Sequence, residues 1–395
     1  MALLGNTSAF DTIFKSEFMN DELTNKKCYI WGAGSDGIRV YKEIKNLIQI
    51  IGFIDSDPHK KGSKIDECNI YDFDHFKKLE KGAYKILIAT SRFEVEIANK
   101  LQSEGYERDI DFCGYKKFYT AYNWLFQQKV YSSFVATSVT QKCTLSCEKC
   151  GHLMPSFKSP RNRPLSEIKL DIDAYFNWVD QVGTFCLAGG EPFLHPEILE
   201  IVEYIGQSWG KKISMIQIVT NGTMVPSEDI LLACKQYNVT ITVSDYSVSV
   251  PRLKKSIDNL VNVMEKYDVS FLKKNPTSTW VDLGFPKTDN SNMTEHQIID
   301  FFDQCNSQCR ELYNQKLYFC SIQPHAIQAG LFKDDVNDYF DLQDYDSSKR
   351  IKFLEFDQGY TELGYITFCK KCNSFASPSA KIIPAAKQTR DRIKL

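Results

Sequence analysis

The stretch SFVATSVTQKCTLSCEKC, residues 133–150, joins an apolar run to three closely spaced cysteines. The run at 133–140 is rich in β-branched and aromatic residues and is typical of a strand. Cys143, Cys147 and Cys150 follow it with the spacing C-x₃-C-x₂-C, on what we expect to be a loop. Three thiolates in so short a loop can wrap one face of an iron–sulfur cluster and leave its fourth iron without a protein ligand.

The triplet has other interpretations. Three cysteines with this spacing also suit a zinc site, for which His152, just beyond the third cysteine, is a candidate fourth ligand. Buried thiols can also pack as small hydrophobic groups without binding a metal. Spacing alone favours the cluster but leaves these alternatives open.

Composition narrows the class of protein. The 395 residues are 43% hydrophobic and 25% charged, which is typical of globular chains of two or three domains. Lys and Arg number 48 against 50 Asp and Glu, a balance that argues against nucleic-acid or anionic-membrane binding. We expect no membrane span and a cytoplasmic location, because there is neither a long apolar run nor an export signal. In that reducing setting, 13 cysteines indicate metal ligands more than disulfides.

Strand and helix patterns alternate along most of the chain, which predicts an α/β protein with parallel sheets. We expect a Rossmann-like parallel sheet in residues 1–125, with an added helix within 1–24. A partial (β/α)6 barrel follows in residues 130–295, and a small α+β cap that binds a cluster occupies residues 300–395 and ends in a basic tail. The expected barrel strands are 133–140, 184–190, 213–222, 239–245 and 269–272.

Further motifs follow the triplet, each at the end of an expected strand. AGGEPFLHP contains Gly189, Gly190, Glu191 and Pro192, VTNGT contains Thr220 and Asn221, and Ser244 and Asp245 end the next strand. Glycine at such a position lets the backbone approach a ligand closely. Together with the triplet, these motifs resemble the signature of the radical S-adenosylmethionine (SAM) enzymes, whose GGEP motif and following strand ends contact SAM.

The resemblance is strong over residues 130–280 and weaker over 300–388. It implies that Cys143, Cys147 and Cys150 ligate a [4Fe–4S] cluster and that SAM chelates the open iron. One electron, from a flavodoxin- or ferredoxin-type donor, then cleaves SAM to a 5′-deoxyadenosyl radical, which takes a hydrogen atom from the substrate. The protein's part is to position the substrate and exclude water.

A second group of cysteines lies in CNSQCRELYNQKLYFC and FCKKC. The arrangement of Cys305, Cys309, Cys320, Cys369 and Cys372 resembles the twitch form of the SPASM module, which implies one auxiliary [4Fe–4S] cluster. Gln315 stands where that family usually has glycine. Five thiols compete for four places, and the choice between Cys305 and Cys309 stays open. A structural zinc, or thiols that bind no metal, are the alternatives.

The other cysteines lie in apolar segments, and we expect them to be core residues: Cys28, Cys68, Cys113, Cys186 and Cys234. Cys186 is the best placed of these to donate a hydrogen atom to a substrate radical, as in an epimerase. Catalytic residues are otherwise unknown: Tyr246 and Glu355 are candidates for substrate contact or proton transfer, although packing roles are favoured for both. We expect His325 to be a surface or packing residue.

The N-terminal segment carries its own ligand motif. Gly32, Gly34 and Gly37 form a G-x-G-x-x-G turn between a strand and a helix, and Asp55 ends the next strand. This context is typical of dinucleotide binding, with a phosphate at the helix N-terminus and the carboxylate on a ribose. The same run resembles Rossmann-like domains of surface-polysaccharide and sugar-nucleotide enzymes. We expect it to hold a nucleotide or NAD, or to be a fold that binds nothing.

These observations favour a radical SAM oxidoreductase or isomerase that acts on a carbohydrate or nucleotide-linked sugar, by oxidation, epimerisation or dehydration, in surface-polysaccharide or secondary-metabolite biosynthesis. One alternative is a maturase of a ribosomal peptide, although the Rossmann-like segment argues against the leader-binding domain that it would need. Another is a zinc-stabilised nucleotide-binding or scaffold protein without catalysis.

Overall fold

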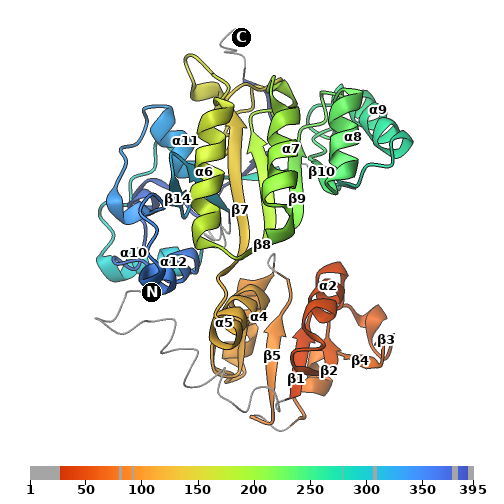
Figure 1. The fold of residues 1–395 in the computed structure, drawn as a ribbon. Helices are drawn as coiled ribbons and strands as arrows, with labels where there is room; N and C mark the ends of the chain where they lie inside the picture. Colours follow the sequence, from red (N-terminus) through yellow and green to blue (C-terminus); the bar gives the residue numbers. More distant parts are fainter. Residues whose placement is uncertain are drawn as a thin grey trace. The chain divides into compact units, whose positions relative to one another are not determined.

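The computed structural model describes residues 27–79, 82–90, 93–277, 279–305, 309–375 and 381–389. These residues fall into two compact units, one ending at Lys129 and the other beginning at Val130 (Figure 1). The helix expected within residues 1–24 lies outside the described residues.

The first unit is built on a mainly parallel sheet with the strand order β3–β4–β2–β1–β5–β6. Strand β1 is parallel to both β2 and β5, so the chain reverses its direction across the sheet beside β1. This order confirms the predicted Rossmann-like sheet and puts the glycine turn after β1 at the switch point where such sheets bind ligands. The strands are β1 (Lys27–Trp31), β2 (Gln49–Ile54), β3 (Lys64–Ile65), β4 (Cys68–Tyr71), β5 (Tyr84–Ile88) and β6 (Phe112–Gly114), and the helices are α2 (Ser35–Ile44), α3 (Phe73–Phe76), α4 (Glu94–Ser103) and α5 (Tyr115–Gln127).

The second unit begins with a series of parallel strands joined by helices. Strands β7 to β11 lie side by side in chain order, and α6 and α7 cover one face of the sheet (Figure 1). This confirms the predicted β/α series, with boundaries within a few residues of those expected. The strands are β7 (Tyr131–Thr140), β8 (Gln181–Gly189), β9 (Ile213–Thr220), β10 (Val239–Val243) and β11 (Phe271–Lys273), and the helices are α6 (Leu165–Trp178), α7 (Ile198–Ser208), α8 (Glu228–Gln236) and α9 (Leu253–Lys266).

The C-terminal part of the chain extends the same sheet. Strand β13 pairs parallel with β7, on the side opposite β8, and β14 and β15 continue the sheet in antiparallel pairing. Strand β12 pairs antiparallel with β16 in a separate ribbon. The elements are β12 (Thr279–Asp282), α10 (Glu295–Asp303), β13 (Arg310–Tyr313), β14 (Lys316–Tyr318), α11 (Ile322–Gln328), β15 (Tyr339–Asp341), α12 (Arg350–Asp357) and β16 (Lys381–Pro384).

Short 3-10 helices connect several of these elements: η3 (Pro58–Lys60), η4 (Met154–Ser156), η5 (Pro192–Leu194), η6 (Gly210–Lys212), η7 (Val336–Asp338), η8 (Ser347–Lys349) and η9 (Thr367–Lys371). Within the described ranges, no helix combines the length and the apolar character that a bilayer crossing requires.

Candidate functional site

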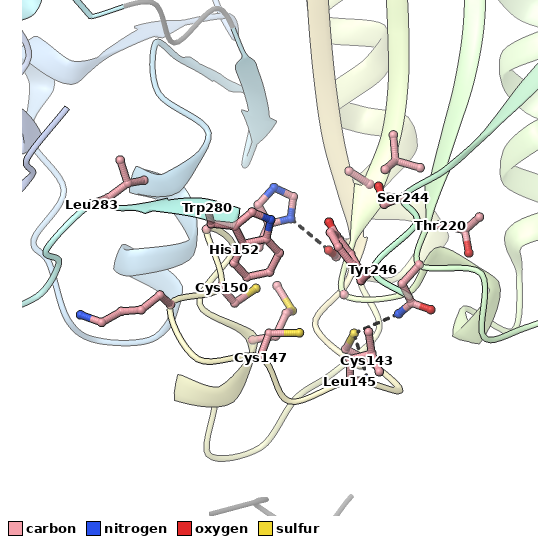
Figure 2. Close-up of a pocket in the computed structure, with 18 of the residues that line it drawn as sticks. Cys143, Leu145, Cys147, Cys150, His152, Thr220, Ser244, Tyr246, Trp280 and Leu283 are labelled. Carbon is pink, nitrogen blue, oxygen red and sulfur yellow. Dashed lines mark hydrogen bonds between the residues drawn. The ribbon is translucent and has the colours of Figure 1, made fainter. Parts of the chain in front are cut away.

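The site lies where the parallel strands of the second unit end. Because β7, β8, β9 and β10 run in the same direction, their carboxyl ends meet at one edge of the sheet, where α/β proteins usually bind ligands. A cavity of about 390 Å³ opens there (Figure 2). Its lining includes Cys143, Cys147, Cys150, His152, Gly189, Gly190, Thr220, Asn221, Ser244, Tyr246, Lys274 and Trp280.

Backbone hydrogen bonds fasten the cysteine loop to the glycine motif of β8. The Gly190 amide donates to the Thr140 carbonyl, and the Glu191 amide donates to the Lys142 carbonyl, each at 2.8 Å. A Cβ atom on Gly190 would lie 2.1 Å from the Lys142 carbonyl oxygen, so glycine is required for this approach. The motif therefore sets the position of the loop that carries the thiols.

The three thiols of the loop line the same cavity (Figure 2). The side-chain amide nitrogen of Asn221 lies 3.6 Å from the Cys143 sulfur, and that of Gln388 lies 3.3 Å from the Cys147 sulfur. Burial raises the pKa of Cys143 to about 12 and that of Cys147 to about 11, so these thiols are protonated until a cation replaces the proton. Amide donors aimed at the sulfurs fit thiolates that hold an iron–sulfur cluster.

The described residues include no group of three or more His, Cys, Asp or Glu side chains arranged to hold a single metal ion. A zinc ion binds each thiolate at about 2.3 Å and so needs its ligands gathered around one point. Each thiolate of a [4Fe–4S] cluster binds a different iron, so the cluster spaces its ligands more widely.

Glu191 follows the glycines of the cavity lining and is fully buried. The Thr220 hydroxyl donates to the Glu191 carboxylate, at 2.9 Å from each oxygen. The backbone amide of Asn221 also donates to this carboxylate, at 2.9 Å. Burial raises the pKa of Glu191 to about 7. The carboxylate thus holds the end of β9, whose Thr220 and Asn221 line the cavity. Pro192 is buried at the start of η5, directly after it.

The residues that follow β10 have two kinds of surroundings: some line the cavity, and Asp245 is bonded to other residues of the protein. Ser244 and Tyr246 are in the lining, and the Tyr246 ring packs edge-on against Trp280 with centroids 5.3 Å apart. The Asp245 carboxylate instead accepts from the Ser247 amide at 2.9 Å and forms an ion pair with Lys273. Glu355 lies elsewhere, buried in α12.

A second group of thiols gathers around Cys369. Burial raises the pKa of Cys369, and the thiols of Cys305, Cys320 and Cys372 raise it further. The Cys305 thiol also raises the pKa of Cys320 and that of Cys372. The C-x₂-C turn is held from the side by Asn290, whose amide donates to the carbonyls of Cys369 and Cys372 at 3.1 and 2.8 Å.

Cys309 is exposed and has a different neighbour. Its thiol raises the pKa of Cys186, a buried residue of β8, after the larger effect of burial. The thiol of Cys305 thus raises the pKa of Cys320, Cys369 and Cys372, whereas that of Cys309 raises the pKa of Cys186. Burial lowers the pKa of the Arg310 guanidinium, and all three thiols of Cys305, Cys309 and Cys320 act to raise it. The remaining cysteines expected in the core are buried: Cys28, Cys68, Cys113 and Cys234.

The glycine turn of the first unit has the backbone geometry of a tight strand-to-helix turn. Gly32 has φ +113°, and a Cβ on Gly37 would lie 1.7 Å from the Gly32 carbonyl oxygen, so both positions require glycine. A Cβ on Gly34 would have no heavy atom within 4 Å, so Gly34 faces open space at the N-cap of α2.

Asp55 is bound to the protein itself. Its carboxylate accepts from the Ala33 amide at 2.7 Å and from the Asp57 amide at 2.8 Å, and it forms an ion pair with Lys60 at 3.0 Å. These contacts brace the glycine turn.

Several residues of the site were missed from the sequence. Trp280, Lys274 and Gln388 come from segments without a recognisable motif, and the pattern around Gln388 predicts only a basic tail. The sequence suggests His152 only as a zinc ligand, but its Nδ1 lies 3.0 Å from the Gly189 carbonyl oxygen. The position of His152 next to the triplet was the only signal.

The second unit contains the radical SAM domain. Residues 137–269 match the model of the radical SAM superfamily, and residues 24–110 match the model described as C2185-like, N-terminal. Residues 137–269 therefore form a radical SAM domain, and that superfamily implies a [4Fe–4S] cluster with SAM.

Similar proteins match only parts of the chain. GTP 3′,8-cyclase of Aquifex aeolicus is 30% identical over 172 residues, which are 41% of this chain and 49% of the cyclase. The subtilosin biosynthesis protein AlbA of Bacillus subtilis is 30% identical over 112 residues, 28% of this chain and 23% of AlbA. The structure of BtrN with AdoMet and 2-DOIA is 15% identical and covers 62% of this chain and 94% of BtrN, with a TM-score of 0.39. The chain thus spans about half the length of the cyclase and less of AlbA.

Proposed function

We propose that this chain is a radical SAM enzyme in which Cys143, Cys147 and Cys150 ligate the SAM-binding [4Fe–4S] cluster. The observation that carries the proposal is the convergence of these thiols with the ends of β8, β9 and β10 on one cavity. When bound and reduced, the cluster supplies the electron that cleaves SAM to a 5′-deoxyadenosyl radical.

The chain's own residues have three tasks in this proposal. Asn221 and Gln388 direct amide hydrogens at the thiolates, and Glu191 holds Thr220 and Asn221 in place. Backbone and side-chain groups of Gly189, Gly190, Thr220, Asn221 and Ser244 orient SAM. The rings of Tyr246 and Trp280 give one wall an apolar surface, which helps to exclude water and stray hydrogen donors.

We assign a second [4Fe–4S] cluster to Cys305, Cys320, Cys369 and Cys372. The set is supported by the effect of the Cys305 thiol, which raises the pKa of Cys320, Cys369 and Cys372. If these four thiolates held a cluster, no iron would be left open for the substrate, and the cluster would supply an acceptor for the electron left on a substrate radical, so that the net reaction would be an oxidation. Epimerisation, with Cys186 as hydrogen donor, and dehydration are the competing outcomes.

The substrate that we propose is a carbohydrate or a nucleotide-linked sugar, in surface-polysaccharide or secondary-metabolite biosynthesis. Its support is the Rossmann-like sheet with a glycine turn at the switch point and open space at Gly34. Because Asp55 is occupied by Ala33, Asp57 and Lys60, we favour phosphate binding at the turn over NAD. The proposal includes a flavodoxin- or ferredoxin-type electron donor and a reducing, cytoplasmic setting.

Deuterium transfer tests the substrate class. The full chain, with SAM and dithionite under anaerobic conditions, is incubated with perdeuterated UDP-sugars and with the matching free sugars. We expect deuterium in 5′-deoxyadenosine with the UDP-sugars, and less transfer when Gly34→Val replaces the unchanged chain. The valine side chain would occupy the phosphate site, and a Cβ at this position has no heavy atom within 4 Å. Equal transfer by Gly34→Val and by the unchanged chain would remove the support that the first unit gives to a nucleotide-linked substrate.

A second candidate is maturation of a ribosomal peptide, and the similarity to AlbA over 112 residues favours it. It predicts deuterium transfer from a labelled precursor peptide and none from any sugar. The same assay therefore separates the two substrate classes.

A further inference from the structure

The end of the described chain crosses the cysteine loop. We call residues Lys381–Thr389 the C-terminal strap. Its first half is β16, which pairs with β12, and two buried alanines, Ala385 and Ala386, follow. Its second half pairs with the loop: the Glu148 amide donates to the Lys387 carbonyl at 2.6 Å, and the Thr389 amide donates to the Ser146 carbonyl at 2.7 Å.

Gln388 is the residue of the strap that reaches a thiol. Its amide oxygen accepts from the Ser146 amide at 2.9 Å. Its amide nitrogen lies 2.7 Å from the Ala386 carbonyl oxygen and 3.3 Å from the Cys147 sulfur. These neighbours determine the orientation of the side-chain amide, because the flipped amide would face a carbonyl with its oxygen and an N–H with its nitrogen. The N–H group is therefore the one that points at the sulfur.

An N–H donor at a cluster sulfur favours the more negative state of the cluster, because the hydrogen bond strengthens with the charge on the sulfur. Reduction adds one electron, so the donor stabilises the reduced state more than the oxidised state. The bond between Gln388 and Cys147 also joins residues 241 positions apart in the chain. The strap is thus placed to affect the reduction potential of the cluster as well as the stability of the fold.

We propose that Gln388 is a positioning residue of the SAM-binding cluster, which orients the Cys147 thiolate and raises the reduction potential of the cluster. This inference rests on the proposed function, because it requires a cluster at the triplet. It gives the C-terminal strap a role in setting the reduction potential of the SAM-binding cluster.

Redox titration of the holoprotein, followed by electron paramagnetic resonance, tests the proposal. The signal of the triplet cluster is identified as the one that changes when SAM is added. Gln388→Leu removes the donor, and we expect a roughly tenfold shift of the reduction equilibrium towards the oxidised cluster, which is about 59 mV for one electron. Gln388→Glu keeps the acceptor for the Ser146 amide but turns a negative oxygen towards the sulfur, so its potential is expected to be at least as low.

Lys387→Met is the matched control. Lys387 lies next to Gln388 in the strap, is exposed and forms an ion pair with Glu148 at 2.9 Å. A role of the strap in stability alone predicts that Lys387→Met and Gln388→Glu change the unfolding temperature and leave the potential unchanged. An unchanged potential in both Gln388 variants with the cluster retained would overturn this inference and leave the proposed function intact. A chain without any SAM-sensitive cluster signal would overturn both.

Discussion

The imidazole rings of His152 and His325 stack on each other with their centroids 4.4 Å apart. His152 follows the cysteine triplet, and His325 lies on α11, shortly after Cys320. His325 is almost fully buried, and its Nε2 lies 3.2 Å from the Ser138 hydroxyl. The expected packing role of His325 therefore has a specific partner, since the stack connects the segment after the triplet to the segment after an auxiliary thiol.

His152 also holds the end of β8, and this gives the first prediction. His152→Phe keeps an aromatic ring against His325 but removes the hydrogen bond to the Gly189 carbonyl. The loss of one such bond, about 1 kcal/mol, is expected to weaken SAM binding to the holoprotein roughly fivefold. His152→Ala, which removes the stack as well, is expected to weaken it further. Calorimetric titration with SAM measures both, and equal affinity of His152→Phe and the unchanged chain would contradict the assigned contact.

The affinity for SAM is expected to depend on pH through Glu191. Burial raises the pKa of this carboxyl to about 7. The positive charges of SAM favour the ionised carboxylate, so binding lowers the pKa and releases a proton when the pH is below 7. SAM affinity should be constant above pH 7 and fall by up to about tenfold per pH unit below it.

Glu191→Gln is the control, because an amide cannot titrate. Its affinity is expected to be lower at pH 8 and independent of pH between 6 and 8. If Glu191→Gln keeps the pH dependence of the unchanged chain, the group that titrates is not Glu191.

The auxiliary site gives a prediction about iron content. The Cys305 thiol raises the pKa of Cys320, Cys369 and Cys372, and we assign it with them as a ligand of the auxiliary cluster. Cys305→Ser is therefore expected to reduce the iron content from about eight to about four atoms per chain. Cys309→Ser is expected to keep about eight, since the Cys309 thiol raises the pKa of Cys186, whereas it is Cys305 that raises the pKa of Cys369. Iron and sulfide analysis of anaerobically reconstituted protein measures both variants, and the reverse result would exchange the two assignments.

The sequence predicts those parts of the structure that depend on local pattern. Strands β7 to β11 follow from apolar runs at regular spacing, and the glycine motif follows from its place at the end of β8. The parallel pairing of β13 with β7 does not follow, because Arg310 and Val135 are distant in the chain and nothing near either one specifies the other. The same reason hides the contact between Gln388 and Cys147, and the preference for Cys305 over Cys309 depends on how distant thiols converge.

The most direct test of the central claim is the formation of 5′-deoxyadenosine. The reconstituted chain is incubated anaerobically with SAM and dithionite, beside a variant in which Cys143, Cys147 and Cys150 are all replaced by serine. We predict 5′-deoxyadenosine and methionine from the unchanged chain and neither product from the variant, with the four iron atoms of the auxiliary cluster retained. No 5′-deoxyadenosine from the iron-loaded chain, or the same amount from the variant, would contradict the account.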